Sequence, residues 1–145
     1  MERQFATFYL ADLLLGVEVE KVQEVLRYQE MTPVPLASSV VEGLINLRGQ
    51  IVTAIDLRRR LDLEERPSGK LPMNVVLRTD DNPVSLLVDE IGDVLQIGDE
   101  TFEAPPETIR GVARELIRGV FKLEGRLLLV LDTDRAMGVG GAQAA

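Results

Sequence analysis

Few residues of this 145-residue chain could do chemistry, and the most specific group among them is a pair of aspartates two positions apart. In the segment "DTD", Asp132 and Asp134 lie on one face if the chain is extended, and paired carboxylates of this kind can hold Mg²⁺ or Ca²⁺. No second aspartate stands at that spacing after Asp56, the residue that aligns with Asp132 in an internal repeat. We therefore favour a strand-end cap over a metal site.

Arginines form the second candidate group. The run Arg58–Arg60 could bind phosphate or an acidic protein surface. In a chain this acidic, such a run is more often a solvated helical turn with one side chain lying over apolar neighbours. Arg48 differs, because it stands within the mostly apolar stretch "GLINLRGQIVTAIDL". Since burying an unpaired guanidinium is prohibitive, Arg48 must face water, a carboxylate or a partner.

The composition excludes most enzyme classes. The chain has no cysteine and no histidine, which removes structural zinc, haem ligation, phosphohistidine chemistry and Cys or Ser/His nucleophile pairs. It also lacks a phosphate loop, a dinucleotide fingerprint and a hydrolase elbow. We therefore expect no catalysis, no cofactor and no metal.

The charge balance limits the partners. The formal net charge is −8, and a surface that binds nucleic acid or anionic membrane needs clustered cations. The apolar stretch near the start is interrupted by Asp12, lacks a small-residue cleavage site and is too short to span a membrane. We expect a cytoplasmic protein without a nucleic-acid partner and without direct membrane insertion.

The elements that must position these residues are mostly strands. Short apolar or β-branched runs bounded by turn residues predict strands over 5–11, 16–22, 49–56, 73–79, 84–91 and 126–132. Two short helices are expected, one after Asp56 and one after Asp132, the second ended by Gly138. Residues 65–72 are predicted to form a flexible loop and 138–145 a flexible tail. This pattern is typical of small barrels or sandwiches.

The chain contains an internal repeat. The segment "GLINLRGQIVTAIDLRRRL" at 43–61 aligns without a gap with "GVFKLEGRLLLVLDTDRAM" at 119–137. A second pair occurs in the same chain order, "EKVQEVLRY" at 20–28 and "DEIGDVLQI" at 89–97, and each copy continues into a connector that contains proline. We infer two similar β lobes, approximately 16–70 and 71–137, with an N-terminal strand that both could share.

The repeat places Glu124 at the position of Arg48. A residue needed only to build the hairpin should be chemically similar in both lobes. The exchange of a cation for an anion therefore suggests that Arg48 recognises something acidic. An equally good alternative is that Arg48 pairs with a carboxylate of the protein itself.

The segment "EKVQEVLRY" has a mixed character. On a strand, Val22, Glu24 and Leu26 share one face and Val25 takes the other, so neither face can be buried whole. Such an edge suits a protein interface. The alternative is a β-bulge or helical turn that directs Val22 and Val25 inward.

Residues 5 to 137 resemble the CheW family, the coupling proteins of bacterial chemosensory arrays. The resemblance rests on the order and spacing of "KVQEV", "TPVP", "VEGLINLRGQIV" with "AIDLR", "LLVDEIGDVL" and "RLLLVLDTDR". It implies an all-β fold of two SH3-like, five-stranded barrels packed around a shared hydrophobic core, with short helical turns, in one domain over residues 1–145. One departure is Thr53, where the family often has proline, and we expect it to loosen that strand edge only.

The resemblance also implies a function. Such proteins are non-catalytic adaptors that bridge the cytoplasmic tips of chemoreceptors, the methyl-accepting proteins, to the regulatory domain of the histidine kinase CheA. It implies a receptor contact at Arg48 and kinase contacts at Val22, Glu24 and Gly43. We add neighbouring residues to each predicted surface: Leu26 and Asn46 to the receptor surface and Val25 to the kinase surface. The protein would be cytoplasmic and recruited to membrane-associated receptor arrays.

A free-standing coupling protein is expected, because no receiver domain follows, no kinase elements precede and the leader before Phe5 is short. The regulatory domain of the kinase itself, which is CheW-like, is the alternative. The competing function is a small-ligand sensor that uses the cleft between the lobes. That function requires a closed pocket with convergent polar groups, for which the sequence offers few candidates.

Overall fold

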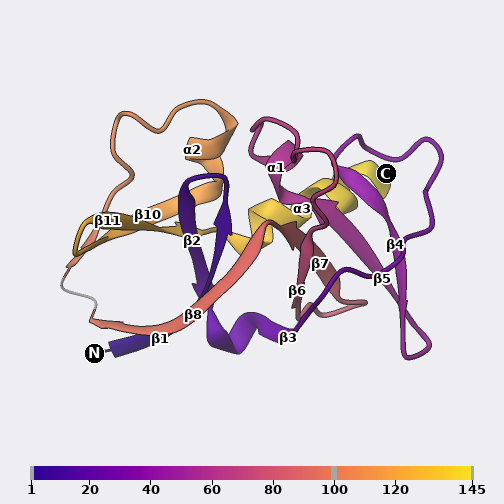
Figure 1. Ribbon diagram of the computed structural model, residues 1–145, viewed down its shortest axis with the longest axis horizontal. Helices are drawn as coiled ribbons and strands as arrows, with labels where there is room; N and C mark the ends of the chain where they lie inside the picture. The colour runs from indigo at the N-terminus through magenta and orange to yellow at the C-terminus, as the bar shows by residue number, and fades with distance from the viewer. Residues whose placement is uncertain (1, 99–100, 145) are drawn as a thin grey trace.

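The chain forms two curved sheets that lie side by side (Figure 1). The computed structural model describes residues 2–98 and 101–144, and the side chains as far as Gly138. The six-stranded sheet has the order β8 (Glu90–Gly98), β1 (Glu2–Leu10), β2 (Leu13–Glu18), β11 (Arg126–Leu131), β10 (Ile117–Leu123) and β9 (Phe102–Glu103). The five-stranded sheet has the order β3 (Val22–Leu26), β6 (Met73–Leu77), β7 (Val84–Val88), β5 (Gln50–Asp56) and β4 (Val41–Leu47).

Short helices connect and cover the strands. A 3₁₀ turn, η1 (Val19–Lys21), leads from β2 into β3, and α1 (Leu57–Arg60) follows β5. The helix α2 (Val112–Leu116) leads into β10, and α3 (Thr133–Ala144) follows β11. Both predicted helices are therefore present. The second continues beyond Gly138, where the sequence predicted its end, and Ala145 lies outside the described residues.

The two sheets share one topology. In each, two antiparallel hairpins are joined by a parallel pair of strands, β5 with β7 in one sheet and β11 with β2 in the other. The parallel pairs include Thr53 opposite Val84 and Leu129 opposite Leu15. Each sheet takes one hairpin from one half of the chain and its remaining strands from the other half: β6–β7 pairs with β3 and β5, and β1–β2 pairs with β8 and β11.

The predicted division of the strands near residue 70 is therefore wrong for the sheets. The strands β6 and β7 were expected in the second lobe, yet they complete the five-stranded sheet. The physical reason is that an isolated hairpin cannot bury its apolar face, and each half of the chain supplies the hairpin against which the other half packs. A sequence repeat reports the order of the strands, but not which strands pair.

The repeat itself is confirmed in the hairpins β4–β5 and β10–β11. Each has a two-residue turn, which Leu47 and Gln50 close in the first hairpin and Leu123 and Arg126 in the second. Each also has a register shift directly before its first repeat glycine. The two hairpins are therefore built alike along their strands, but their turns differ: both Arg48 and Gly49 have positive φ in the first, whereas in the second Gly125 does and Glu124 does not.

Gly43 and Gly119 let a crossing segment approach closely. A Cβ at Gly43 would lie 2.8 Å from the carbonyl oxygen of Thr32, and a Cβ at Gly119 would lie 2.6 Å from that of Glu103. Thr32 pairs with Leu44 of β4, and β9 pairs with β10 in the same way. Both Pro-containing connectors thus run against the hairpin at the position where a side chain is missing.

The core has three parts. One apolar cluster lies between the sheets and takes residues from both, among them Phe8, Leu57 and Leu86. The six-stranded sheet curls around a second cluster that includes Phe5 and Phe121, and the five-stranded sheet around a third, which consists of Ile45, Leu47, Val52, Ala54, Val76 and Leu87. Each sheet therefore has an interior of its own, and both pack on a shared layer.

Candidate functional site

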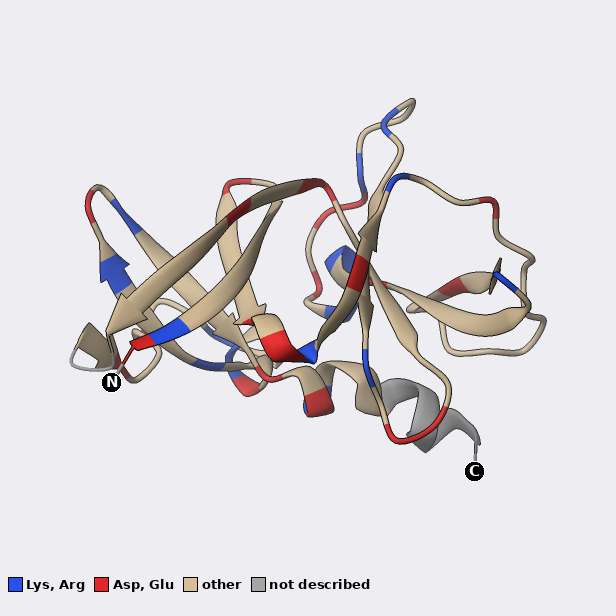
Figure 2. Cartoon of the chain, turned by 90° about the horizontal axis from the view of Figure 1, so that it is seen from below, with Lys and Arg blue, Asp and Glu red and all other residues tan. Residues whose placement is uncertain are grey.

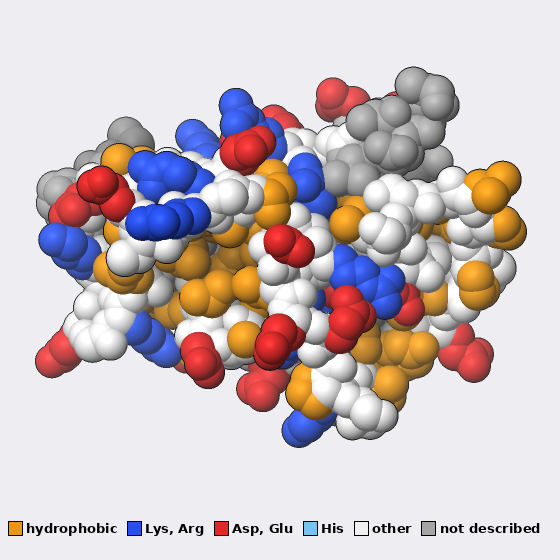
Figure 3. All heavy atoms as spheres, turned by 90° about the horizontal axis from the view of Figure 1, so that it is seen from above, with side chains coloured by type: hydrophobic (Ala, Val, Ile, Leu, Met, Phe, Trp, Pro, Cys, Tyr) orange, Lys and Arg blue, Asp and Glu red, His pale blue; other side chains and the backbone are white. Residues whose placement is uncertain are grey.

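The surface carries mixed charge. Acidic and basic side chains are interspersed over both lobes in the views from below and from above (Figures 2 and 3).

No helix in the described part of the chain combines the length and the apolar character that a membrane span needs.

The predicted binding residues all lie in or beside the five-stranded sheet. They come from β3, from β4 and from the turn that follows β4: Val22, Glu24, Val25, Leu26, Gly43, Asn46 and Arg48. Since β3 and β4 are the two edge strands of this sheet, its curvature must bring them toward each other before their side chains can meet.

Arg48 lies in the tight turn between β4 and β5. Its φ is +52° and that of Gly49 is +85°, and two successive positive values are typical of a type I′ hairpin turn. The side-chain oxygen Oδ1 of Asn46 accepts a hydrogen bond from the backbone nitrogen of Gly49 at 2.9 Å. A non-glycine residue at positive φ is strained, and such strain is often found at functional positions.

The guanidinium of Arg48 pairs with the carboxylate of Glu24 and remains largely in solvent. Its Nη2 donates a hydrogen bond to Oε2 of Glu24, while the Arg48 side chain is 66% exposed and that of Glu24 is 24% exposed. The internal carboxylate that we expected as one alternative is therefore present, and recognition of an external acidic group stays a prediction. We call Glu24, Asn46, Arg48 and Gly49 the hairpin corner.

The strand β3 bulges between Val22 and Glu24. Val22 packs against the shared core and Leu26 against the interior of the five-stranded sheet, whereas Val25 is 40% exposed. The bulge weighed as the alternative is therefore present, and it turns Val22 inward but leaves Val25 outside. Of the predicted residues on β3, Val25 is exposed, and Val22, Glu24 and Leu26 are each partly buried.

Gly43 is buried. With no side chain, and with the backbone of Thr32 against it, its role in the structure is to admit the connector. Asn46 is exposed and lies opposite Ile51, an apolar side chain that is 48% exposed. The accessible surface at this end of the sheet thus combines a paired arginine and carboxylate with apolar and amide groups.

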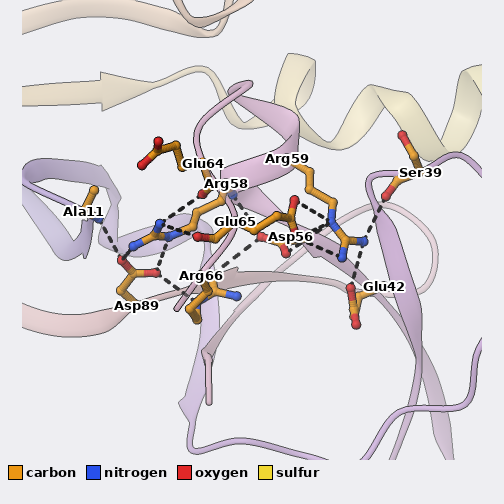
Figure 4. Close-up of polar contacts among 10 residues, drawn as sticks. All are labelled: Ala11, Ser39, Glu42, Asp56, Arg58, Arg59, Glu64, Glu65, Arg66 and Asp89. Atoms are coloured by element: carbon orange, nitrogen blue, oxygen red, sulfur yellow. Dashed lines mark hydrogen bonds and ion pairs between the residues drawn. The ribbon is translucent and has the colours of Figure 1, made fainter. Parts of the chain in front are cut away.

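A second arginine–carboxylate site was not predicted (Figure 4). Asp89 lies between β7 and β8, where the chain passes from one sheet to the other. Arg58, only 7% exposed, donates from Nε to its Oδ1 at 2.9 Å and from Nη2 to its Oδ2. Arg66 donates from Nε to Oδ1 at 2.9 Å, and the backbone nitrogen of Ala11 donates to Oδ2 at 2.7 Å.

These contacts hold Asp89 ionised. Desolvation by burial opposes ionisation, but the hydrogen bonds from Arg58, from the Ala11 backbone and from Arg66 outweigh it and lower the pKa of Asp89 to about 2. The hydrogen bond to Asp89 also raises the pKa of Arg58, against the effect of desolvation. We call Asp89, Arg58 and Arg66 the Asp89 cluster.

The expectation of a solvated helical turn at Arg58–Arg60 is wrong for Arg58. Its Nη1 also donates to the carbonyl oxygens of Glu64 and Glu65 at 3.0 and 3.3 Å, and its backbone nitrogen to Oδ1 of Asp56 at 3.0 Å. A run of arginines gave no signal for this role, because a sequence does not show which carboxylate faces which guanidinium.

The other two arginines of the run also contact neighbouring segments of the chain. Arg59 lies 3.0 Å from Glu42 and 3.2 Å from Glu65, while Arg60 donates to the carbonyl oxygens of Arg135 and Ala136 in α3 at 2.8 and 3.2 Å. The run Arg58–Arg60 thus links α1 to Asp89, to the carboxylates of Glu42 and Glu65, and to the backbone of α3.

Asp132 is the cap that we favoured over a metal ligand. Its Oδ1 accepts a hydrogen bond from the backbone nitrogen of Arg135 at 3.1 Å, as Asp56 does for Arg58 in α1. Within the described part of the chain, no group of three or more His, Cys, Asp or Glu residues is placed to hold a metal ion.

An apolar hollow lies between β2, β11 and the residues that precede α2, and is visible in the left half of Figure 3. One part, with a volume of about 200 Å³, is lined by Leu13, Leu15, Leu61, Leu63, Thr108, Ile109, Arg110, Ala113, Ile117 and Leu129. Its lining offers two polar side chains, Thr108 and Arg110. A ligand site needs several polar groups that converge, so this part of the hollow does not support the small-ligand sensor.

Comparisons with known proteins agree with this architecture. The family model for the CheW-like domain matches residues 4–139. The chain is 34% identical over 133 residues to the chemotaxis protein CheW of Treponema pallidum (strain Nichols), covering 89% of this chain and 78% of that protein. It is 30% identical over 130 residues to the chemotaxis protein CheW of Bacillus subtilis (strain 168), covering 90% and 83%.

A solved structure is similar as well. The crystal structure of the scaffolding protein TtCheW from Thermoanaerobacter tengcongensis superposes with a TM-score of 0.81 at 26% identity, covering 91% of this chain and 90% of that chain. Together with the sheets and the three-part core, this superposition confirms the expected fold of two barrels around a shared core. The expected number of five strands holds for one sheet, and the other has six, because the two-residue strand β9 adds to its edge.

Proposed function

The chain belongs to the CheW family, and on that premise we propose that it is a non-catalytic adaptor that couples chemoreceptors to a CheA-type histidine kinase in bacterial chemosensory signalling. The protein works in the cytoplasm and is recruited to membrane-associated receptor arrays. Its partners are the cytoplasmic tip of a chemoreceptor and the regulatory domain of the kinase.

One observation carries the receptor side of the proposal. Arg48 is a largely exposed cation on a strained turn, at a position where the equivalent hairpin has Glu124. An exposed guanidinium held in a fixed direction suits a carboxylate on a helical receptor tip, since charge-assisted pairs to arginine are both strong and directional. Asn46 is the polar neighbour that supports this turn, and Leu26 supports β3 from inside.

The kinase side uses β3. Glu24 and Val25 offer a carboxylate and an apolar side chain to a partner, while Val22 and Gly43 act through the shape of the bulge and of the connector. An edge strand with both kinds of group can contact another β domain without forming a closed core.

The adaptor transmits a signal through differences in affinity. A rigid linker changes kinase output only if it binds one signalling state of the receptor more tightly than another. Modest interfaces are sufficient when they are repeated across an array, because each engaged contact raises the effective concentration of the next.

The test is assembly from purified parts. We expect the chain, a receptor cytoplasmic tip and the kinase to form a ternary complex in a pull-down, with kinase activity under receptor control. Changing Arg48 to Glu should raise the receptor concentration needed for half-maximal control of the kinase by about tenfold or more, because a carboxylate then meets an acidic tip. The fold and kinase binding should persist. Normal coupling by a folded Arg48→Glu protein would remove Arg48 from the mechanism. Absence of any ternary complex with the unchanged chain would refute the function.

A further inference from the structure

Glu24 and Arg48, which the proposed function gives to two different partners, are bonded to each other. While they are paired, each offers its own partner a charge that the other partly neutralises. The contact also joins the two edge strands of the five-stranded sheet, so it sits where both partners would approach.

The pair is weak enough to be exchanged. Arg48 is 66% exposed and Glu24 is partly exposed, and ion pairs of this kind contribute little because water competes for both charges. The guanidinium has five N–H donors, of which the Glu24 carboxylate accepts from Nη2. A carboxylate from outside can replace Glu24 without opening the core.

We propose that the Glu24–Arg48 ion pair couples the two partner sites by carboxylate exchange. A cation on the kinase surface takes the carboxylate of Glu24 and frees Arg48, and the receptor's carboxylate then binds Arg48 without an internal competitor. By linkage, receptor binding strengthens kinase binding by the same factor. This inference rests on the proposed function and adds the regulation of its site.

The other lobe provides an internal control. The residues equivalent to Glu24 and Arg48 in the repeat are Asp93 and Glu124, both acidic and both exposed. Two carboxylates cannot form an ion pair, so the six-stranded sheet has no such exchange. The coupling is therefore a property of one hairpin corner and not of the repeated scaffold.

The experiment measures receptor-tip affinity with and without a saturating kinase regulatory domain. For the unchanged chain we expect the kinase domain to tighten receptor binding about two- to fivefold, the range that an exposed ion pair supplies. For Glu24→Gln, which keeps shape and loses charge, we expect receptor binding alone to tighten by that factor, and the kinase domain to add nothing. Asp93→Asn should leave both values unchanged.

A second variant tests the reverse direction. Arg48→Asn removes the cation but suits a turn with positive φ, because asparagine tolerates that conformation. We expect it to lose receptor binding and to bind the kinase domain two- to fivefold more tightly, since Glu24 is then free. A merely structural role for Arg48 would not tighten any interaction.

The outcomes separate the inference from the function. If the unchanged chain binds both partners but Glu24→Gln retains the same tightening by the kinase domain, or if Arg48→Asn binds the kinase domain no better, carboxylate exchange is wrong and the adaptor stands. If the unchanged chain binds neither partner, the adaptor itself is wrong.

Discussion

The hairpin corner and the Asp89 cluster both pair an arginine with a carboxylate, but the two pairs differ in burial and in role. In both, an arginine meets a carboxylate across a long distance in the sequence: Arg48 with Glu24, and Arg58 with Asp89. The corner arginine is 66% exposed and makes one such contact, whereas the side chain of Arg58 is 9% exposed and donates to both oxygens of Asp89 as well as to two carbonyl groups.

Burial decides which of the two sites can exchange its partner. Breaking an exposed pair returns both charges to water, but breaking a buried one leaves charges that nothing solvates. The Asp89 cluster therefore fixes the crossing between the sheets, and the hairpin corner is free to serve a partner. The predictions below test this contrast, beginning with the largest effect.

Removing the buried carboxylate should have the largest effect. Changing Asp89 to Ala leaves Arg58 and Arg66 without their shared anion, and we expect the free energy of unfolding to fall by about 3–5 kcal/mol. Denaturant unfolding followed by circular dichroism measures the loss. Asp93→Ala, on the strand β8 that follows Asp89 but exposed, is the matched control and should change stability by less than about 0.5 kcal/mol. Equal losses in both variants would contradict the assignment of Asp89 as the fixed site.

Acid should weaken the Asp89 cluster. The pKa of Asp89 in the folded protein is about 2, below its ordinary value of 3.8, so protons bind more readily to the unfolded chain. The stabilisation is fully present above about pH 4 and is lost as the pH falls toward 2, by up to about 2 kcal/mol. Stability measured from pH 6 to pH 2 should fall more steeply for the unchanged chain than for Asp89→Asn. Parallel curves would show that Asp89 does not link folding to protonation.

The hairpin corner should have the smallest effect on stability. We expect Glu24→Gln and Arg48→Asn each to change the free energy of unfolding by less than about 1 kcal/mol, because the pair is exposed and asparagine relieves strain at positive φ. The same unfolding measurement applies. A loss as large as that of Asp89→Ala would make the corner a structural site and would undermine its proposed exchange.

The sequence predicts the strands and the repeat well, because both depend on local patterns. Apolar runs between turn residues located five strands, and a gap-free self-comparison located the paired hairpins. The run 16–22 was wrong as one strand, because it covers the end of β2, the turn η1 and the first residue of β3. Sheet membership was not predictable in this way, because the pairing of β7 with β5 and of β2 with β11 is set by packing between distant segments. The run 84–91 was read as one strand, although Asp89 divides it between two sheets.

The candidate site was also predictable only where its signal is local in the sequence. Arg48 was recognisable because a lone charge beside a turn glycine in an apolar stretch cannot be buried. Its bond to Glu24 was not, because it depends on the curvature that brings two edge strands together. Asp89 resembled an ordinary acidic turn residue, and only the fold brings Arg58 and Arg66 to it.

The exchange of hairpins between the two halves has an ancestral consequence. A half-length chain with one hairpin and one set of crossing strands is incomplete alone, but two copies that traded hairpins would form this same architecture as a twofold-symmetric dimer. In such a dimer, both corners would have to be identical. When two such copies are joined in one chain, as by the loop at 61–72, each half can mutate independently. One hairpin turn can then carry a cation, as at Arg48, while the equivalent turn carries an anion, as at Glu124.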